Sequence, residues 1–300
     1  MNGLESLIGL IEGIGAAFIT FYLVALGHSI FEKAGLLDLA IDGVFFMSTG
    51  AAVLGAVAFG NPVIGSIVAM LIASMFGLLM AYLLTSLPIS HGAVGLSLQF
   101  LGYGLGIVLG YPLRQTIGAL YAYCYTDEVL IELIIVTIVI GVVAHLLIEK
   151  TKIGAAIRAV GESPHAASSL GVNVLFTRLV AGAMGFALMG LGASFFPLLW
   201  QKYWDIKVYT LGYGWLSFTI ALAAGRHPIF LIPMALLFGG LVEYSVTIQT
   251  LFKLPPDVAK LIPFVGALGA MLTYSFTRLR RIFASPQSLG KVYYREEKTV

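Results

Sequence analysis

The chain has 300 residues, of which 59% are hydrophobic and 11% are charged, and its formal net charge at pH 7 is +2. A chain this apolar cannot cover its own surface with polar side chains, which excludes a soluble globular domain. The small positive charge comes largely from the tail after Phe276, so it favours contact with the inner membrane leaflet and not nucleic-acid binding.

Apolar runs of helical length follow one another along the chain. They are Leu7–Gly27, Val44–Gly60, Pro62–Leu84, Ala93–Gly110, Val129–Ile148, Leu179–Leu199, Thr210–Ala224, Ile229–Ile248 and Ala259–Phe276. A helix needs about 20 residues to cross the hydrocarbon, and the alternation typical of a β-barrel strand is missing from these runs. The sequence therefore predicts an all-α, polytopic transmembrane helix bundle of about nine spans, eight to ten being compatible with the run lengths. The short Thr210–Ala224 run indicates a broken or re-entrant helix.

Two stretches resemble each other, Gly60–Tyr82 and Gly225–Tyr244. Each contains a glycine, a proline that is expected to open a span, a Phe-Gly pair and a tyrosine. If the two spans run in opposite directions, the pattern predicts an inverted-topology repeat, a common plan for transporters. The alternative is a chance recurrence, because Pro and Gly are frequent in membrane helices.

Polar side chains inside apolar spans are candidates for an aqueous path, because uncompensated polar groups are costly in hydrocarbon. Asp38 and Asp42 are four residues apart and would share one face of a helix, where they would either line the inner mouth of a path or simply face water. Gln99 lies mid-span with Tyr103 one turn later, which suits a pore lining or an interhelical hydrogen bond. Glu243 is a weaker candidate, since its place near a span end favours snorkelling to the interface.

The longest polar interruption is TKIGAAIRAVGESPHAASSLG, from Thr151 to Gly171. Ser163 is a suitable N-cap with Pro164 at the first helical position, and Gly171 suits a left-handed position after the helix end. The segment therefore predicts a short capped helix outside the bilayer, on which a soluble partner docks.

The distribution of basic residues predicts the orientation of the chain. With this loop and the C-terminus in the cytoplasm, twelve Lys and Arg residues lie inside and five outside. The positive-inside rule supports that topology and an external N-terminus.

The sequence offers no set of residues for catalysis. The five histidines lack metal-ligand spacing, no Ser/His/Asp arrangement suggests a nucleophile, and the phosphate-loop pattern of ATPases is missing. Cys124 is the single cysteine, so no internal disulfide forms. We expect neither an enzyme nor a cofactor in this chain, and a membrane-embedded enzyme is the least favoured class.

Three segments together resemble a known family. FEKAGLLDLAIDG (Phe31–Gly43), the Thr151–Val172 loop and GYGWLSFTIALAAGRHP (Gly212–Pro228) are similar to motifs of permeases in the branched-chain amino acid and simple-sugar group of ABC importers, particularly the nucleoside branch. The loop is the most specific of the three. Asp38, Ala40 and Asp42 depart from the family's Asn, Gly and Glu, and His91-Gly92 stands where an Asn-Gln pair is common. These departures bear on substrate identity more than on fold.

The resemblance implies a permease domain over residues 1–277, with a coupling loop at 150–177, and a basic cytoplasmic tail over residues 278–300. It implies that Pro164–Leu170 is a coupling helix that fits a cytoplasmic ATP-binding subunit, with Arg158 and Glu162 fixing its orientation. The residues expected to couple the ATPase are Arg158, Glu162, Ser163, Pro164, His165, Ala166, Ala167 and Gly171.

The same resemblance implies the partners and the location. A nucleoside or simple sugar would arrive from an extracytoplasmic binding lipoprotein and cross the inner membrane between this chain and a second permease subunit, either a paralogue or a second copy. The alternative class is an ion-coupled secondary transporter of a small polar solute, which an inverted repeat with Gln99 and Glu243 in the membrane would also fit. Dependence on ATP separates the two.

Overall fold

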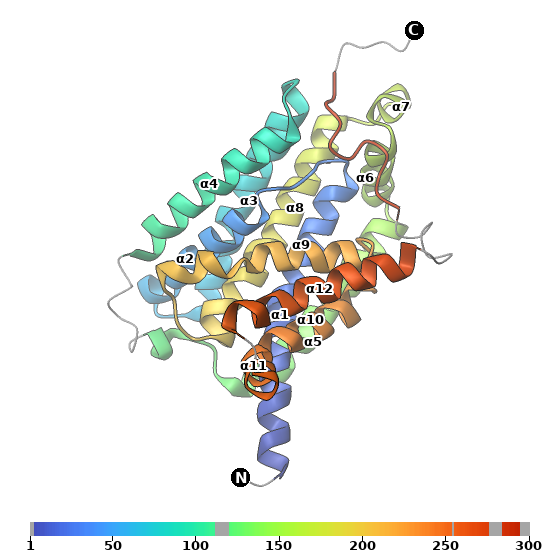
Figure 1. The fold of residues 1–300 in the computed structure, drawn as a ribbon. Helices are drawn as coiled ribbons and strands as arrows, with labels where there is room; N and C mark the ends of the chain where they lie inside the picture. The colour runs from blue at the N-terminus through green and yellow to red at the C-terminus, as the bar shows by residue number, and fades with distance from the viewer. Residues whose placement is uncertain (1–2, 112–119, 254, 276–283, 295–300) are drawn as a thin grey trace.

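A computed structural model describes residues 3–111, 120–253, 255–275 and 284–294. These residues form helices and connecting segments without any strand (Figure 1). The α-helices are α1 (Gly3–Lys33), α2 (Ile41–Phe59), α3 (Pro62–Ser86), α4 (His91–Gly110), α5 (Leu130–Lys150), α6 (Lys152–Glu162), α7 (Pro164–Ser169), α8 (Val174–Phe195), α9 (Tyr213–Ala223), α10 (Leu231–Glu243), α11 (Ser245–Phe252) and α12 (Pro256–Ser275). Shorter helical turns are η2 (Leu120–Tyr123), η3 (Asp127–Val129), η4 (Phe196–Trp200) and η5 (Ile206–Leu211). The predicted all-α class is confirmed.

Six helical segments of the described chain are long and apolar enough to cross a membrane. They are Glu12–Lys33, Ile41–Phe59, Pro62–Ser86, His91–Gly110, Leu120–Lys150 and Val174–Trp200, and α10 with α11, bent by 55°, makes a seventh if the pair is one span. The polytopic architecture is confirmed, whereas the predicted number of spans is larger than this count. The Thr210–Ala224 run covers the end of η5 and α9, whose 11 residues are too few to cross on their own.

Local sequence determines the tight turn between α2 and α3. Gly60 ends α2 in a left-handed conformation, with φ of 66°. The Asn61 side chain accepts a hydrogen bond from the Val63 amide at 2.8 Å, and Pro62 occupies the first turn of α3. Pro228, which was expected to open the corresponding later span, instead precedes α10, which begins at Leu231.

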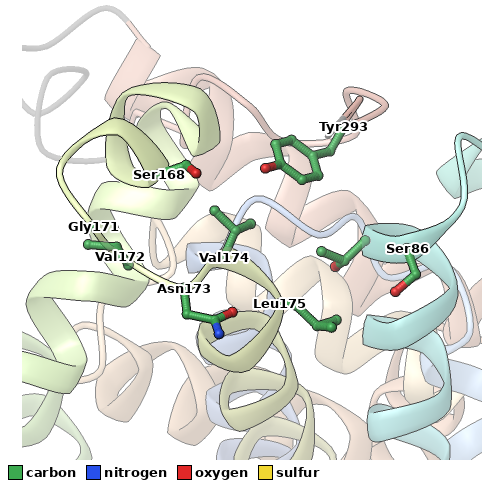
Figure 2. A pocket seen from close by; sticks show the side chains of 9 residues that line it. Ser86, Ser168, Gly171, Val172, Asn173, Val174, Leu175 and Tyr293 are labelled. Atoms are coloured by element: carbon green, nitrogen blue, oxygen red, sulfur yellow. The ribbon is translucent and has the colours of Figure 1, made fainter. Parts of the chain in front are cut away.

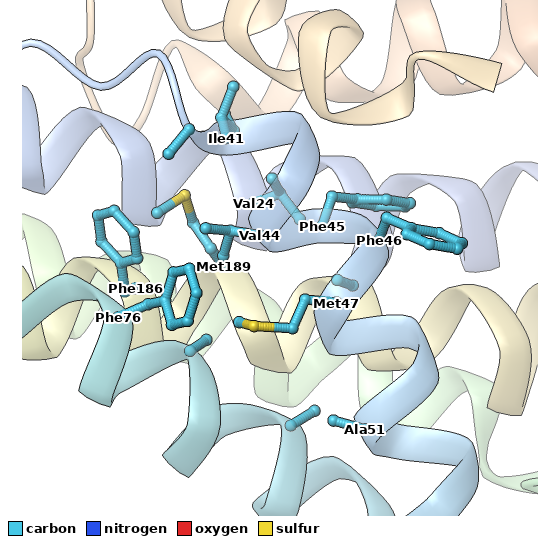
Figure 3. Packing of buried hydrophobic residues seen from close by; sticks show 14 of the residues in the cluster. Val24, Ile41, Val44, Phe45, Phe46, Met47, Ala51, Phe76, Phe186 and Met189 are labelled. Atoms are coloured by element: carbon cyan, nitrogen blue, oxygen red, sulfur yellow. The ribbon is translucent and has the colours of Figure 1, made fainter. Parts of the chain in front are cut away.

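The helix α1 forms the centre of the bundle. Its membrane-length segment is 94% buried, and it packs against α5, α8, α9 and α10. A helix that is apolar on every face belongs in a core. Beside it, Val44 and Met47 of α2 pack in one cluster with Phe76, Phe186 and Met189 from α3 and α8 (Figure 3).

Glycines allow the central helices to approach closely. A Cβ at Gly27 of α1 would overlap the carbonyl oxygen of Gly185 on α8, and one at Gly77 of α3 would overlap that of Gly182. Small residues thus let the helix backbones come together at these two crossings, as is common between membrane helices.

The two ends of the helix bundle carry different segments of the chain. The hairpin of α6 and α7 and the C-terminal segment 284–294 lie at one end, and the N-terminus lies at the opposite end (Figure 1).

Candidate functional site

The hairpin of α6 and α7 is the first candidate site. Thr151 caps α6 by accepting a hydrogen bond from the Gly154 amide at 3.1 Å. Ser163 ends α6 and caps α7, accepting from the Ala166 amide at 3.3 Å, while Pro164 is the first residue of α7. Gly171 follows with φ of 86°. The short capped helix predicted from the sequence is therefore present, and α6 forms a second helix before it.

The two faces of α7 have different environments. Pro164 and Ala167 are buried, and Ala167 lies in a small apolar cluster with Val160 and Val174. The other face is exposed, with Ala166, Ser168 and Ser169 on α7, and the exposed residues Glu162 and Leu170 flank the helix. Ala167 was expected to couple the ATPase; its side chain is buried and anchors α7 to the rest of the protein. The surface available for docking is the exposed face.

Leu170 lies in the predicted coupling helix, but sequence reasoning did not include it among the residues expected to couple the ATPase. It follows α7, and 85% of its surface is exposed. A large aliphatic side chain that is solvated at the tip of a polar loop gains stability from a partner that covers it. Its position at the end of an otherwise polar run was the signal that could have identified it.

Arg158 connects the hairpin to α5. Its guanidinium donates hydrogen bonds to the Glu149 carboxylate at 2.9 Å and to the Ile148 carbonyl oxygen at the end of α5. A cation at the C-terminal end of a helix also interacts favourably with its dipole. Arg158 therefore fixes the direction of α6, whereas the side chain of Glu162 is exposed.

A polar cluster inside the apolar bundle is the second candidate site. Gln99 Nε2 donates to the Tyr103 hydroxyl at 3.1 Å, and that hydroxyl donates to Asp42 Oδ2 at 2.6 Å. Asp42 Oδ1 accepts from the backbone amides of Gly214 at 2.8 Å and Trp215 at 3.4 Å. Asp42 is 3% exposed and Gln99 is 6% exposed. The structure thus brings together three of the five predicted path residues.

This cluster lies where a helical segment breaks. Gly212, with φ of 66°, separates η5 from α9, in the region where a broken or re-entrant helix was expected. Gly212 has no side chain to cap α9, and Asp42 supplies the cap from another helix. Two glycines allow the helices that carry this cluster to approach closely. A Cβ at Gly43 would overlap the backbone of Gln99, and a Cβ at Gly214 would overlap Asp42.

Asp38 belongs to a different, ionic cluster. It precedes α2 and is not on the helix that carries Asp42, so the expectation of a shared helix face was wrong. Both carboxylates are buried, so neither faces water. Asp38 Oδ2 lies 3.3 Å from His28 Nδ1. The other carboxylate oxygen of Asp38, Oδ1, accepts a hydrogen bond from the Ala40 backbone amide, which takes the place of a helical hydrogen bond for that amide.

Two further charged residues complete this ionic cluster. His28 Nε2 is 3.3 Å from Glu32 Oε2, and Arg226 Nε donates to the same oxygen. Sequence reasoning missed His28, Glu32 and Arg226 as a set because they come from both halves of the chain.

In the turn after α9, burial lowers the pKa of His227, with Lys33 adding to the effect, which keeps that imidazole neutral near pH 7.

Glu243 lies apart from both clusters. Its Oε2 accepts a hydrogen bond from Trp200 Nε1 at 2.7 Å, and its side chain abuts Gly13 near the N-terminal end. A cavity of about 340 Å³ there is lined by Glu12, Gly13, Asp127, Lys202 and Glu243 among others. The structure does not join Glu243 to the Asp42 cluster.

Within the residues that the structure describes, no group of three His, Cys, Asp or Glu side chains is placed to hold a metal ion.

A cavity of about 460 Å³ opens beside α7. Thr85 and Ser86 at the end of α3, Ser168, Asn173 and Tyr293 line it together with the residues around them (Figure 2). Tyr293 comes from the C-terminal segment, so that segment forms part of the surface around α7.

Comparisons with known proteins agree with this architecture. The family model for the permease component of branched-chain amino acid transport systems matches residues 10–271. The putative glucose ABC transporter permease of Haloferax volcanii is 24% identical, with 96% of this chain and 98% of the relative covered. The nucleoside ABC transporter permease of Lactococcus lactis subsp. cremoris is 23% identical, covering 80% and 84%. The guanosine ABC transporter permease of Bacillus subtilis is 25% identical, covering 83% and 86%.

A solved structure has a similar fold. It is PsaBC from Streptococcus pneumoniae in complex with Fab, with a TM-score of 0.50, 17% sequence identity and 93% of each chain covered.

Proposed function

The chain belongs to the family of permease components of branched-chain amino acid transport systems, and we propose that its cargo as an ATP-binding cassette importer subunit is a nucleoside or a simple sugar. As a member of that family it is a multi-pass protein of the inner membrane. The cargo proposal is supported by relatives that carry the names of nucleoside, guanosine and glucose permeases.

The hairpin of α6 and α7 is the proposed contact with a cytoplasmic ATPase subunit. The exposed face of α7 with Leu170 presents the docking surface, while Pro164 and Ala167 hold the helix to the bundle. Arg158 and the double role of Ser163 as end of α6 and cap of α7 give the hairpin a fixed direction. ATP is bound and hydrolysed by that partner, and this chain uses no cofactor of its own.

The polar cluster at the break between η5 and α9 is the proposed contact with cargo. Discontinuous membrane helices commonly build substrate sites, because the break frees backbone groups near the middle of the bilayer. Asp42 accepts the hydrogen bonds of the freed amides of α9, so the Gln99 side chain is the group that we assign to cargo binding. Gln99 Oε1 is buried and has no hydrogen-bond partner among the described residues, so it would accept from a sugar hydroxyl once the cluster opens to the path. Asp38 and Glu243 are bound in other clusters and are secondary candidates.

Nearby aromatic side chains suit a base or a sugar ring. The ring centroid of Trp215 lies 5.8 Å from that of Phe218, and that of Phe100 lies 6.2 Å from that of Tyr103. The side chain of Phe100 is exposed, and those of Tyr103, Trp215 and Phe218 are partly exposed. We place the path between this face and a second permease subunit, and we assign delivery of cargo to an extracytoplasmic binding lipoprotein.

Helix packing supports the inverted repeat as a proposal. The helix α1 packs on α8, α9 and α10, while α8 packs on α1, α2 and α3, as expected if α1 to α3 correspond to α8 to α10. Gly77 of the first Phe-Gly pair faces α8, and Gly239 of the second faces Ala17 and Phe18 of α1. The helix α3 ends beside α7, whereas α10 ends near Gly13, so the two run in opposite directions.

The proposed topology places the loop at 150–177 and the C-terminus in the cytoplasm and the N-terminus outside. It is supported by the excess of basic residues on the loop side and by the separation of the two ends in the fold. Segments η5 with α9, and α12, supply the remaining spans of the proposed nine-span arrangement.

The deciding test is co-expression of this chain with an ATPase subunit, a second permease and a binding protein, followed by uptake of radiolabelled guanosine and glucose into proteoliposomes. We expect ATP-dependent uptake, and loss of ATPase co-purification in Leu170→Glu but not in Lys207→Glu, a control at an exposed residue of η5. Uptake that continues without the ATPase and collapses with an uncoupler would instead establish a secondary transporter.

A further inference from the structure

The C-terminal segment 284–294 is attached to the hairpin of α6 and α7. The backbone amide of Ser288 donates to the Gly161 carbonyl oxygen at 3.0 Å, and the Ser288 hydroxyl donates to the same oxygen at 2.6 Å. The hydroxyl also lies 3.3 Å from the Val160 carbonyl oxygen, and Ser288 is buried. These bonds occupy the last turn of α6, directly before the coupling helix.

Tyr293 fixes the segment beneath α7. It is 8% exposed and packs with Val160, Ala167 and Val174. Its ring centroid lies 5.0 Å from that of His165 on α7 and 5.5 Å from Arg178 Cζ on α8. One aromatic ring therefore contacts α6, α7 and α8 together.

The Tyr293 ring also lies against a buried charge, the guanidinium of Arg178. The Arg178 side chain is fully buried, and its Nε donates to the Ala34 carbonyl oxygen at 3.2 Å. Neither of its Nη nitrogens has a hydrogen-bond partner among the described residues. The face of an aromatic ring is attractive to a buried cation, so Tyr293 partly compensates the charge of Arg178.

The other end of the segment reaches the ionic cluster. Arg226 Nη1 donates to the Ser285 hydroxyl at 2.9 Å, and Arg226 also binds Glu32 of α1. Between the two ends, the Gly290 amide lies 3.4 Å from the Gly35 carbonyl oxygen, in the connection between α1 and α2. The segment thus joins the hairpin to the inner end of α1 and to the corner between α9 and α10.

We propose that residues 285–293 form a coupling strap, in which Ser288 and Tyr293 are positioning residues that transmit movement of the coupling helix to α1, α2 and α9. The proposal rests on the ATPase-docking role assigned to α7. It gives the C-terminal segment a mechanical task in place of the membrane-surface contact that its basic composition suggested. Movement is transmitted through contiguous packed and hydrogen-bonded groups, and the strap supplies them between the hairpin and the Glu32–Arg226 pair.

The strap also has room to shift. Cavities of about 460 Å³ and 320 Å³ flank Tyr293, the first toward the end of α3 and the second between α7 and residues Gln287–Val292. Their open volume lets the Tyr293 ring move when a partner presses on α7. A strap packed on all sides could hold the hairpin but could not change position with it.

The test uses the full importer in proteoliposomes and measures guanosine taken up for each ATP hydrolysed. In Tyr293→Ala, we expect the ATPase to co-purify and ATP hydrolysis to continue, with uptake per ATP lowered about threefold or more. Tyr293→Phe, which keeps the ring, restores the ratio, and Tyr294→Ala, at the neighbouring exposed residue, leaves it unchanged. Uptake and hydrolysis that fall in parallel in Tyr293→Ala, or a Phe variant as defective as Ala, would overturn the strap.

A second pair of variants guards against a folding defect. Ser288→Ala removes only the hydroxyl bonds to α6, and Gln287→Ala is the exposed control. If Tyr293→Ala does not reach the membrane, a lowered ratio in Ser288→Ala supports the strap and an unchanged ratio refutes it. Failure of the proposed function is distinguishable, because the unmodified chain would then lack ATPase co-purification or ATP-dependent uptake.

Discussion

The carboxylate of Asp42 on α2 caps the first turn of α9 through the backbone amide of Gly214, whose nitrogen lies 2.8 Å from Oδ1. The cap is supplied by a helix some 170 positions earlier in the chain, because Gly212 at the start of α9 carries no side chain. The break in this segment is therefore held by an interhelical contact, and the packing of α2 controls the position of α9.

The Asp42 cap predicts different effects for two substitutions. Asp42→Ala leaves the amides of α9 and the Tyr103 hydroxyl without this acceptor, and an unmade buried hydrogen bond costs about 1–3 kcal/mol. Asp42→Asn keeps an oxygen toward Gly214 and offers an amide group to Tyr103, so we expect it to lose less than about 1 kcal/mol. Thermal unfolding of the purified protein in detergent measures both. Equal losses in the two variants would show that the charge, and not the cap, matters.

The close contact at Gly214 predicts a steric effect. A Cβ at this position would lie 2.8 Å from Asp42 Oδ1 and closer still to the Asp42 backbone, so Gly214→Ala must push α9 away from α2. We expect a loss of about 1–3 kcal/mol in unfolding free energy, as for other overpacked sites. Gly104→Ala on α4 is the control, since no atom lies within 4 Å of its added methyl group. The control should be as stable as the parent or slightly more stable, because alanine favours helix.

The sequence predicted the local features of this molecule well. Ser163, Pro164 and Gly171 determined the ends of α7 through capping and backbone preference, which act within a few residues. The apolar runs located the helices, since continuous hydrophobicity is itself the signal for membrane spans. These features depend on residues that are neighbours in the chain.

Features that depend on distant contacts were not predictable in the same way. Asp38 and Asp42 are close in sequence, yet one pairs with His28 and the other with α9, because α2 begins at Ile41 between them. The burial of Ala167 requires Tyr293, which lies over a hundred positions later. The spacing of apolar residues along α7 cannot show which residue of the C-terminal segment covers its buried face. Apolar runs also do not determine the number of spans, because α9 is apolar but too short to cross the membrane on its own.

The ionic pair of Glu32 and Arg226 predicts a large stability effect. Both side chains are buried, and Glu32→Gln leaves Arg226 with a much weaker partner. Removing one partner of a buried pair costs about 3–5 kcal/mol, so we expect this variant to unfold at markedly lower temperature. Glu149→Gln is the matched control, because its pair with Arg158 is about one third exposed and worth less than about 1 kcal/mol. Similar losses in both variants would contradict the burial argument.

The proposed orientation predicts a pattern of chemical labelling. In a Cys124→Ser background, which has no other cysteine, Ser169→Cys should react with a membrane-impermeant maleimide only from the cytoplasmic side, because its loop carries α7. Lys207→Cys, at an exposed site before α9, should react from the outer side. Whole cells and inverted vesicles give the two measurements. The reverse pattern would place the hairpin outside and remove the ATPase contact.

The environment of Ala167 predicts that a substitution there acts on folding before it acts on docking. Ala167 is 2% exposed beside Val160, Val174 and Tyr293, so Ala167→Arg forces a charge and a long side chain into a closed apolar site. We expect lower thermal stability together with lost ATPase co-purification. Ala166→Arg, one residue earlier on the exposed face, should keep the stability of the parent and lose only co-purification. Stability that is unchanged in Ala167→Arg would mean that α7 is held to the bundle by Pro164 and the Ser163 cap alone.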